Sequence, residues 1–319
     1  MLENINTVLG KINDFVWGVP LIVLILAAGI FLTIRLKGIQ VTKLGKGFKL
    51  MFAKGEQDGH GEISSFGALC TALSATIGTG NIVGVATAIV TGGPGALFWM
   101  WIAALFGTAT KFSECMLAIK YRTIAEDGHV VGGPFYYIEN GMGKNWKWLA
   151  KIFAFFGVCV GLFSIGTFTQ VNGISSAVKN FFDPDTKHVA FKLFGIEYSW
   201  TIVISGIILT ICVGLVIIGG LKRITNVAQV IVPFMAILYV IAALLVIIFN
   251  IDKVPGAFKE IIESAFGLKA AAGGTLGAII VAMQKGIARG IFSNEAGLGT
   301  APIAAAAAKS NEPVEQGLV

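Results

Sequence analysis

The sequence predicts an all-α protein that crosses a membrane several times. Of its 319 residues, 55% are hydrophobic and only 13% are charged, and the mean hydropathy is +0.80. A typical soluble domain has about 25% charged residues. The apolar residues also cluster in blocks of about 20, which is the helix length that crosses a bilayer core. Composition and block length together therefore indicate a polytopic helical membrane protein.

Seven blocks are predicted to be spans, and polar stretches with glycine, proline and charged residues separate most of them. The first block lacks a basic leader and a small-residue cleavage site, so it is predicted to be a span and not a signal peptide. Two further stretches, 36–60 and 255–266, mix apolar and charged residues and are predicted to be amphipathic helices at the membrane surface. The seven predicted spans are 15–35, 63–91, 95–120, 149–178, 200–219, 224–250 and a last one that ends near 308.

The basic residues predict the orientation of the spans. The net charge is +6, and lysine and arginine concentrate in segments 35–60, 120–151 and 220–223. These segments alternate along the chain with loops in which acids match or outnumber bases. Because basic loops stay in the cytoplasm, the three segments are predicted to be cytoplasmic and the N-terminus to lie outside. No basic stripe with interleaved aromatic residues is present, which argues against a nucleic-acid partner.

The usual signatures of metal sites and catalysis are missing from the sequence. Its four cysteines are scattered through apolar blocks without a CxxC pair, which predicts neither a metal site nor a disulfide framework. The three histidines fall in predicted loops. The sequence contains no zinc-protease motif, no nucleophile elbow and no phosphate-binding loop. The protein is therefore predicted not to be an enzyme and not to be driven by ATP.

An internal repeat links two pairs of glycines. The stretch IGTGNIVGVATAI (77–89) aligns with AGLGTAPIAAAAA (296–308). Five predicted spans separate the copies, counting the first copy, so the second copy would run in the opposite direction. Glycine-interrupted spans at matching positions of inverted halves are typical of transporters that bind substrate at the bilayer midplane. A chance match between two Gly/Ala-rich stretches is the alternative. The matched pairs are Gly78 with Gly297 and Gly80 with Gly299.

A break in a membrane helix offers two kinds of binding group. Glycine in a helix interior costs about 1 kcal/mol relative to alanine, and residues 78–81 are predicted to be non-helical. The freed N–H groups at the start of the resumed helix suit a carboxylate. The freed carbonyls, which lipid cannot satisfy, suit a hard cation such as sodium. One break can therefore bind a carboxylated solute and a cation side by side.

Four motifs carry a resemblance that covers nearly the whole chain. The stretches GTGNIVGVATAI, GGPGALFWMW, GGPFYYIENGMG and ARGIFSNEAGLGTAP closely resemble the alanine or glycine:cation symporter family of prokaryotes, and SNEAGLG is a highly specific part. The resemblance implies a LeuT-type inverted-repeat transporter fold with one extra N-terminal helix. It also implies sodium- or proton-coupled uptake of alanine or glycine across the cytoplasmic membrane.

The resemblance divides the chain into three regions. Residues 1–62 would hold the extra transmembrane helix and the interfacial amphipathic helix, 63–250 the first five-helix repeat, and 251–319 the start of the second, inverted repeat. Such a fold has five spans in each half, so the chain is expected to be C-terminally incomplete by about four spans. The missing part would include a helix that contributes to the sodium site.

The predicted binding site gathers at the two breaks and on the span 149–178. Gln170 is an amide that can both donate and accept, and Thr167 lies on the same face at helical spacing. The alternative for Thr79, Asn81 and Gln170 is that they only hydrogen-bond neighbouring helices. The predicted substrate-binding residues are Gly78, Thr79, Gly80, Asn81, Thr167, Gln170, Gly297 and Gly299, and the predicted sodium ligands are Ala75, Gly78 and Thr79.

Charged residues inside spans are expensive and usually pair or serve function. Lys111 and Glu114 would either form an ion pair or leave Glu114 to cap the backbone at one of the breaks. Glu295 directly precedes the second glycine pair, and it could act in a similar way or help the coupling ion. Glu114 and Glu295 are thus predicted to be structural or coupling residues. Lys285 and Arg289 either reach outward to the membrane surface or line an aqueous vestibule.

The predicted function is sodium-coupled symport of a small neutral amino acid, alanine or glycine, by alternating access. Sodium is the predicted co-transported ion, and no organic cofactor and no obligate protein partner are predicted. Proton-coupled transport of another small solute on the same fold is the alternative. An ion channel would need repeated pore loops or an oligomer-forming span, and a membrane enzyme would need a catalytic set inside the spans. Neither feature is visible in the sequence.

Overall fold

The computed structural model describes residues 2–53, 61–163, 165–193, 195–268 and 274–319, and nearly all of its regular structure is helical. Two short antiparallel hairpins, β1 (Thr123–Ile124) with β2 (Val130–Val131) and β3 (Val189–Leu193) with β4 (Ile196–Ser199), lie between helices. The α-helices are α1 (Leu2–Val16), α2 (Val19–Arg35), α3 (Ile39–Thr42), α4 (Leu44–Met51), α5 (Ser65–Thr76), α6 (Thr79–Gly92), α7 (Gly95–Lys120), α8 (Pro134–Met142), α9 (Lys147–Leu162), α10 (Ile165–Phe182), α11 (Trp200–Ile217), α12 (Gly220–Phe249), α13 (Val254–Ala265), α14 (Thr275–Asn294), α15 (Ala301–Ala306) and α16 (Pro313–Leu318).

Seven candidate spans lie in the described part of the chain, and their number agrees with the prediction. Six are long apolar helical stretches, and the seventh is the pair α5–α6, which is bent by 41°. The first stretch begins at Asn6, earlier than predicted. The last ends at Asn294 and not near 308, because the helix breaks there before α15. By length and composition, the prediction of a helical polytopic membrane protein is confirmed.

Helix α7 lies at the centre of the packing and contacts α2, α13, α14, α15 and α16. Its closest neighbour is α14, where Gly286 and Gly290 face it. A Cβ at Gly286 would overlap the carbonyl oxygen of Ala96, and a Cβ at Gly290 would lie 3.0 Å from the Cβ of Ala103. Small residues four apart let two membrane helices approach closely. The end of α14, and the break that follows it, therefore lie beside α7.

The predicted surface helix at 36–60 is shorter than expected and is divided into α3 and α4. The chain enters α3 through Lys37 and Gly38, both of which have left-handed backbone angles. Val41, Leu44 and Phe48 are exposed apolar residues on these helices. Positions 54–60 lie outside the described residues. The helix predicted at 255–266 is confirmed as α13.

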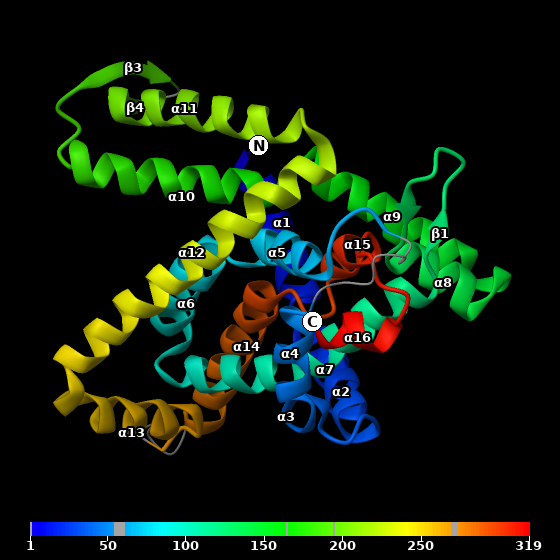
Figure 1. The fold of residues 1–319 in the computed structure, drawn as a ribbon. Helices are drawn as coiled ribbons and strands as arrows, with labels where there is room; N and C mark the ends of the chain where they lie inside the picture. The colour runs from blue at the N-terminus through cyan, green and yellow to red at the C-terminus, as the bar shows by residue number, and fades with distance from the viewer. Residues whose placement is uncertain (1, 54–60, 164, 194, 269–273) are drawn as a thin grey trace.

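The remaining helices form an outer layer. Helices α10 and α11 lie side by side at one edge, with the β3–β4 hairpin between them in the chain (Figure 1). The long helix α12 then runs diagonally back across the molecule to α13 and contacts α5 on the way (Figure 1). This arrangement brings α10 and α12 against the bent pair α5–α6.

Candidate functional site

The first break lies between α5 and α6 and is shorter than predicted. Residues 78–81 were expected to be non-helical, but α6 already begins at Thr79, so Gly80 and Asn81 are helical. The reason is local capping. The side-chain oxygen of Asn81 accepts a hydrogen bond from the backbone nitrogen of Gly78 at 2.9 Å, and the Asn81 backbone nitrogen donates to the Gly78 carbonyl at 3.1 Å. This reciprocal pair starts the helix one residue after Gly78.

Gln170 of α10 closes the first break from one side. Its side-chain oxygen accepts a hydrogen bond from the backbone nitrogen of Thr79 at 3.0 Å. A Cβ at Gly78 would overlap the Gln170 amide, and a Cβ at Gly173 would lie 2.5 Å from Cγ2 of Thr79. These two glycines therefore let α10 reach the backbone of the break. Thr167, one turn before Gln170 on α10, is exposed.

The break also redirects donors away from the last turn of α5. In a continuous helix, the N–H groups of Gly78 and Thr79 would bond the carbonyls of Ser74 and Ala75. Here they donate to Asn81 and Gln170 instead. The carbonyls of Ser74 and Ala75 lose those helical donors, which leaves them able to bind another group.

The second break separates α14 from α15 and has a different backbone conformation. Glu295, Gly297 and Gly299 all have positive φ angles, of 55°, 87° and 76°. In the first break, by contrast, Gly78 is extended with a φ of −165° and Gly80 is helical. The aligned glycine pairs thus interrupt the chain at matching places without sharing a conformation.

Glu114 of α7 caps the second break. Its side chain is buried, and its carboxylate accepts hydrogen bonds from the backbone nitrogens of Gly297, at 3.4 Å, and of Gly299. Lys111, one turn earlier, donates to the carbonyl of Glu295 at 3.3 Å. Two alternatives were predicted for these residues, an ion pair between Lys111 and Glu114 or capping of a break by Glu114, and the structure shows capping. Gly299 is itself buried, and a Cβ there would lie 2.6 Å from Pro134.

Hydrogen bonds also join the two breaks to each other. A carboxylate oxygen of Glu295 accepts from the hydroxyl of Thr76, at the end of α5, at 3.2 Å and from that of Thr300, just before α15, at 2.7 Å. The Asn81 amide donates to the hydroxyl of Ser293 at 2.8 Å. Helix α6 packs against α14 and α5 against α15. The two bent segments therefore form one unit around a polar centre.

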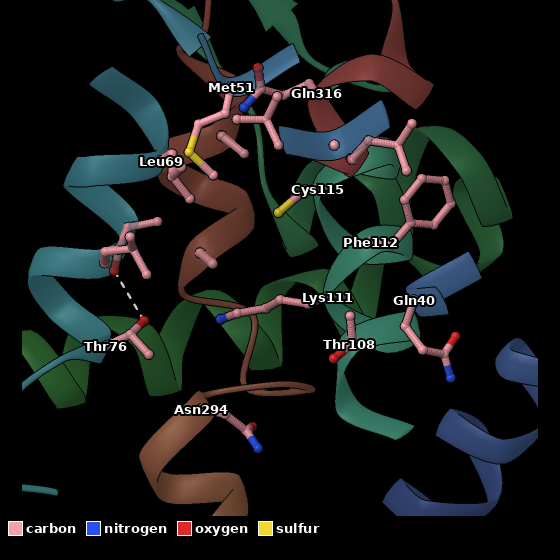
Figure 2. A pocket seen from close by; sticks show the side chains of 18 of the residues that line it. Gln40, Met51, Leu69, Thr76, Thr108, Lys111, Phe112, Cys115, Asn294 and Gln316 are labelled. Carbon is pink, nitrogen blue, oxygen red and sulfur yellow. Dashed lines mark hydrogen bonds between the residues drawn. The ribbon is translucent and has the colours of Figure 1, made fainter. Parts of the chain in front are cut away.

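A cavity of about 510 Å³ lies beside this polar centre, between α3, α4, α5, α7, α15 and α16. Lys111 and Thr76 extend into the space from α7 and α5, and Leu69 and Phe112 belong to its mostly apolar wall (Figure 2). Its volume is in the range of small-molecule sites, about 300–1,000 Å³. Among the predicted substrate-binding residues, Asn81 lines this cavity, whereas Thr79 faces Gln170.

Comparison with known proteins identifies the family. The Sodium:alanine symporter family matches the chain over residues 2–319. The chain belongs to this family. The candidate spans and the family together make it a multi-pass membrane protein of a prokaryote.

Three curated relatives illustrate the range of this symporter family. The chain is 52% identical over 316 residues to an uncharacterized transporter of Haemophilus influenzae and 46% identical over 316 residues to the sodium/alanine symporter AgcS of Methanococcus maripaludis. It is 40% identical over 319 residues to the probable sodium/glutamine symporter GlnT of Bacillus subtilis. These matches cover 99%, 98% and 100% of the chain but 65%, 65% and 62% of the relatives. The chain therefore spans less than two-thirds of the length of these relatives.

The structure adds three hydroxyl residues that the sequence did not indicate. Thr76 and Ser293 supply bonds between the breaks, and Thr300 binds the same Glu295 oxygen as Thr76 from within the second break. Each stands within a few residues of a glycine or glutamate of the two motifs, and that position is the signal that could have found them. Lys285 and Arg289 of α14 are exposed, and the Lys285 stem lies against Gly92.

Proposed function

We propose that the protein is a sodium-coupled symporter of a small neutral amino acid, alanine or glycine, that works by alternating access on a LeuT-type fold. Family membership supports symport, and the name of AgcS supports sodium and alanine. The observation that carries the proposal is the pair of breaks, α5–α6 and α14–α15, which meet around one polar centre. Paired broken helices of this kind are typical of midplane transport sites.

In this proposal the substrate carboxylate takes the place of the Gln170 oxygen at the Thr79 N–H group. That N–H is the first free donor of α6, at the positive end of the helix. The displaced Gln170 amide can then donate a hydrogen bond to the same carboxylate. Gly78 keeps a Cβ atom away from the Gln170 amide, Gly80 follows in the first turn of α6, and Thr167 lies on the same helix as Gln170.

The proposed sodium site uses the carbonyl side of the same break. The Ala75 carbonyl has lost its helical donor, and Gly78 and Thr79 follow it in the chain. Oxygen ligands at short range are what a hard cation requires. Gly297 and Gly299 have a different proposed role, because their N–H groups already donate to Glu114. Their hydrogen bonds to Glu114 fix the backbone conformation of the second break, and a hydrogen bond between Glu295 and Thr76 connects this break to the end of α5.

Proton coupling is the second candidate. The chain is 42% identical over 309 residues to a putative sodium/proton-dependent alanine carrier protein of Bacillus subtilis, YrbD. The carboxyl groups of Glu114 and Glu295, both beside the second break, would be the proton carriers in that case.

Uptake of labelled alanine into proteoliposomes separates these possibilities. An inward sodium gradient at equal pH is expected to drive alanine accumulation, and unlabelled alanine and glycine are expected to compete. Accumulation driven by a proton gradient alone would favour the second candidate. Competition by glutamine without competition by glycine would overturn the assigned substrate class. Alanine uptake that is the same with and without the sodium and proton gradients would contradict symport.

A further inference from the structure

The far ends of the two bent segments are joined by backbone pairing. Just before α5, the backbone nitrogen of Glu62 donates to the carbonyl of Ala307 at 2.8 Å. The backbone nitrogen of Lys309 donates to the carbonyl of Ile63 at 2.7 Å, which completes a short parallel bridge between Ile63 and Ala308. Ile63 and Ala308 are 5% and 0% exposed, so this junction is buried from solvent in the structure.

Arg122, two residues after α7, binds one side of this junction. Its guanidinium donates to the carbonyls of Ala306 at 2.9 Å, Ala308 at 2.7 Å and Ser310 at 2.7 Å. Carbonyls at the end of a helix have no helical donors, and a cation is favourable there. Only the rigid fork of arginine supplies several donors in one plane, so a lysine cannot replace these three bonds.

The hairpin β1–β2 binds the other side of the junction. A carboxylate oxygen of Glu62 lies 3.0 Å from Nδ1 of His129 and accepts from the backbone nitrogen of Val130 at 3.3 Å. The chain after the hairpin packs closely on α15, because a Cβ at Gly132 would lie 2.6 Å from the Cβ of Ala306. Residues 121–133 thus contact the start of α5 and the end of α15 together.

We propose that Arg122, Glu62 and His129, with the paired backbone of 62–63 and 306–310, form a latch. The latch connects α5 and α15 to each other and to the end of α7, so that these two half-helices move as one body. Both must separate from the latch at the same time before the side of the protein that contains this junction can open. The proposal rests on the alternating access proposed above. These three bonds to main-chain carbonyls come from one side chain, so substitution of Arg122 removes all of them. The competing explanation is that Arg122 only caps α15.

Thiol labelling distinguishes a latch from a local cap. In a variant without Cys70, Cys115, Cys159 and Cys212, the substitutions Ile63→Cys and Ala308→Cys are made separately. Arg122→Ala is expected to speed labelling at both positions by at least about tenfold, and Arg122→Lys by less. Arg223→Ala is the matched control, because Arg223 also donates to a carbonyl near a helix end, that of Leu215 in α11. It should leave both labelling rates unchanged.

Faster labelling at position 308 alone would overturn the latch, because it would show a fraying α15 and an undisturbed α5. The double variant Ile63→Cys with Ala308→Cys tests release with Arg122 in place. Its disulfide is expected to reduce alanine uptake in proteoliposomes to background, and a reductant is expected to restore it. Normal uptake with the disulfide intact would also overturn the latch. The labelling result does not depend on uptake, so the latch and the proposed transport can fail separately.

Discussion

The side-chain oxygen of Gln170 occupies the first free backbone donor of α6, the N–H of Thr79, at a distance of 3.0 Å. An amide oxygen at this position resembles one oxygen of a carboxylate. The contact links α10 to the first break through a group that a bound carboxylate could replace. Gln170 is therefore the side chain on which the proposed substrate site can be tested most directly.

Gln170→Ala is expected to weaken alanine binding by about 1–3 kcal/mol, or roughly five- to 150-fold in Kd, because the bound carboxylate loses the hydrogen bond that the displaced Gln170 amide donates in the proposed complex. Binding of labelled alanine to purified protein measures the change. Asn172→Ala is the matched control, since Asn172 is an exposed amide on the same helix. Unchanged binding together with lower thermal stability would make Gln170 a purely structural hydrogen bonder.

Gly78→Ala and Gly80→Ala are expected to differ, although the glycines are two residues apart. A Cβ at Gly78 would overlap the Gln170 amide and keep it from donating to a carboxylate bound at Thr79, so alanine binding should fall steeply. A Cβ at Gly80 would only contact the Phe292 ring at 3.4 Å. Because Gly80 is helical, its replacement should stabilise the protein by up to about 1 kcal/mol. Thermal unfolding and alanine binding of both variants measure the contrast, and equal loss of binding would contradict it.

Glu114→Ala is expected to lower the thermal unfolding midpoint, with a loss of about 1–3 kcal/mol, because it leaves the N–H groups of Gly297 and of the buried Gly299 without their acceptor. Glu114→Gln keeps one acceptor oxygen and should lose less. The control is Glu126→Ala, at an exposed position in the loop after α7. If the two alanine variants unfold at the same temperature, Glu114 does not support the second break.

The orientation predicted from the basic loops is tested by labelling intact cells. Single cysteines are placed at Lys46 of α4 and at Asp185, between α10 and β3, in a background without other cysteines. A membrane-impermeant thiol reagent is expected to reach position 185 and not position 46. The reverse pattern would invert the topology and place the Arg122 latch on the outer side.

The junction between Glu62 and His129 predicts a pH dependence. The hydrogen bond and charge of Glu62, with the charge of Asp127, raise the pKa of His129 above its ordinary value of 6.5, and Lys222 opposes them. A raised pKa in the folded state means that the pair stabilises the junction fully below pH 6.5. This contribution is lost as the pH rises through the raised value. Labelling of Ile63→Cys should therefore accelerate with rising pH.

Thiols themselves react faster at high pH, so the rate must be divided by that of an exposed cysteine at position 185. His129→Ala is expected to abolish the remaining pH dependence. A ratio that is independent of pH in the protein with His129 would show that the ion pair does not hold the junction.

The extent of the first break shows where a sequence-based prediction stops. The glycines at 78 and 80 indicate a weak point in a membrane helix, and the structure has a bend there. Sequence spacing nevertheless places the non-helical stretch too far along the chain. Asn81 caps Gly78 and Gln170 satisfies Thr79, so the helix resumes at once. The Gln170 contact spans 91 positions and leaves no periodic pattern in the sequence.

The alignment of the two glycine pairs has a similar limit. It predicted correctly that the chain would be interrupted near residue 297, but it also implied that the two breaks offer their backbone in the same way. At the second break a buried carboxylate from another helix, Glu114, accepts the hydrogen bonds of Gly297 and Gly299. The sequence alone is compatible with this role for Glu114 and with an ion pair between Glu114 and Lys111.

The number of candidate spans in the described part of the chain, the approximate ends of most of them and the positions of the two interruptions follow from the sequence by itself. Each of these depends on local properties: the apolar length that a bilayer requires and the backbone freedom of glycine. The sequence does not determine the partners of the freed backbone groups, because a donor such as the Thr79 N–H can donate to any nearby oxygen. Tertiary packing alone selected Gln170, Glu114 and Arg122 for these positions, since it brings together groups that lie far apart in the chain.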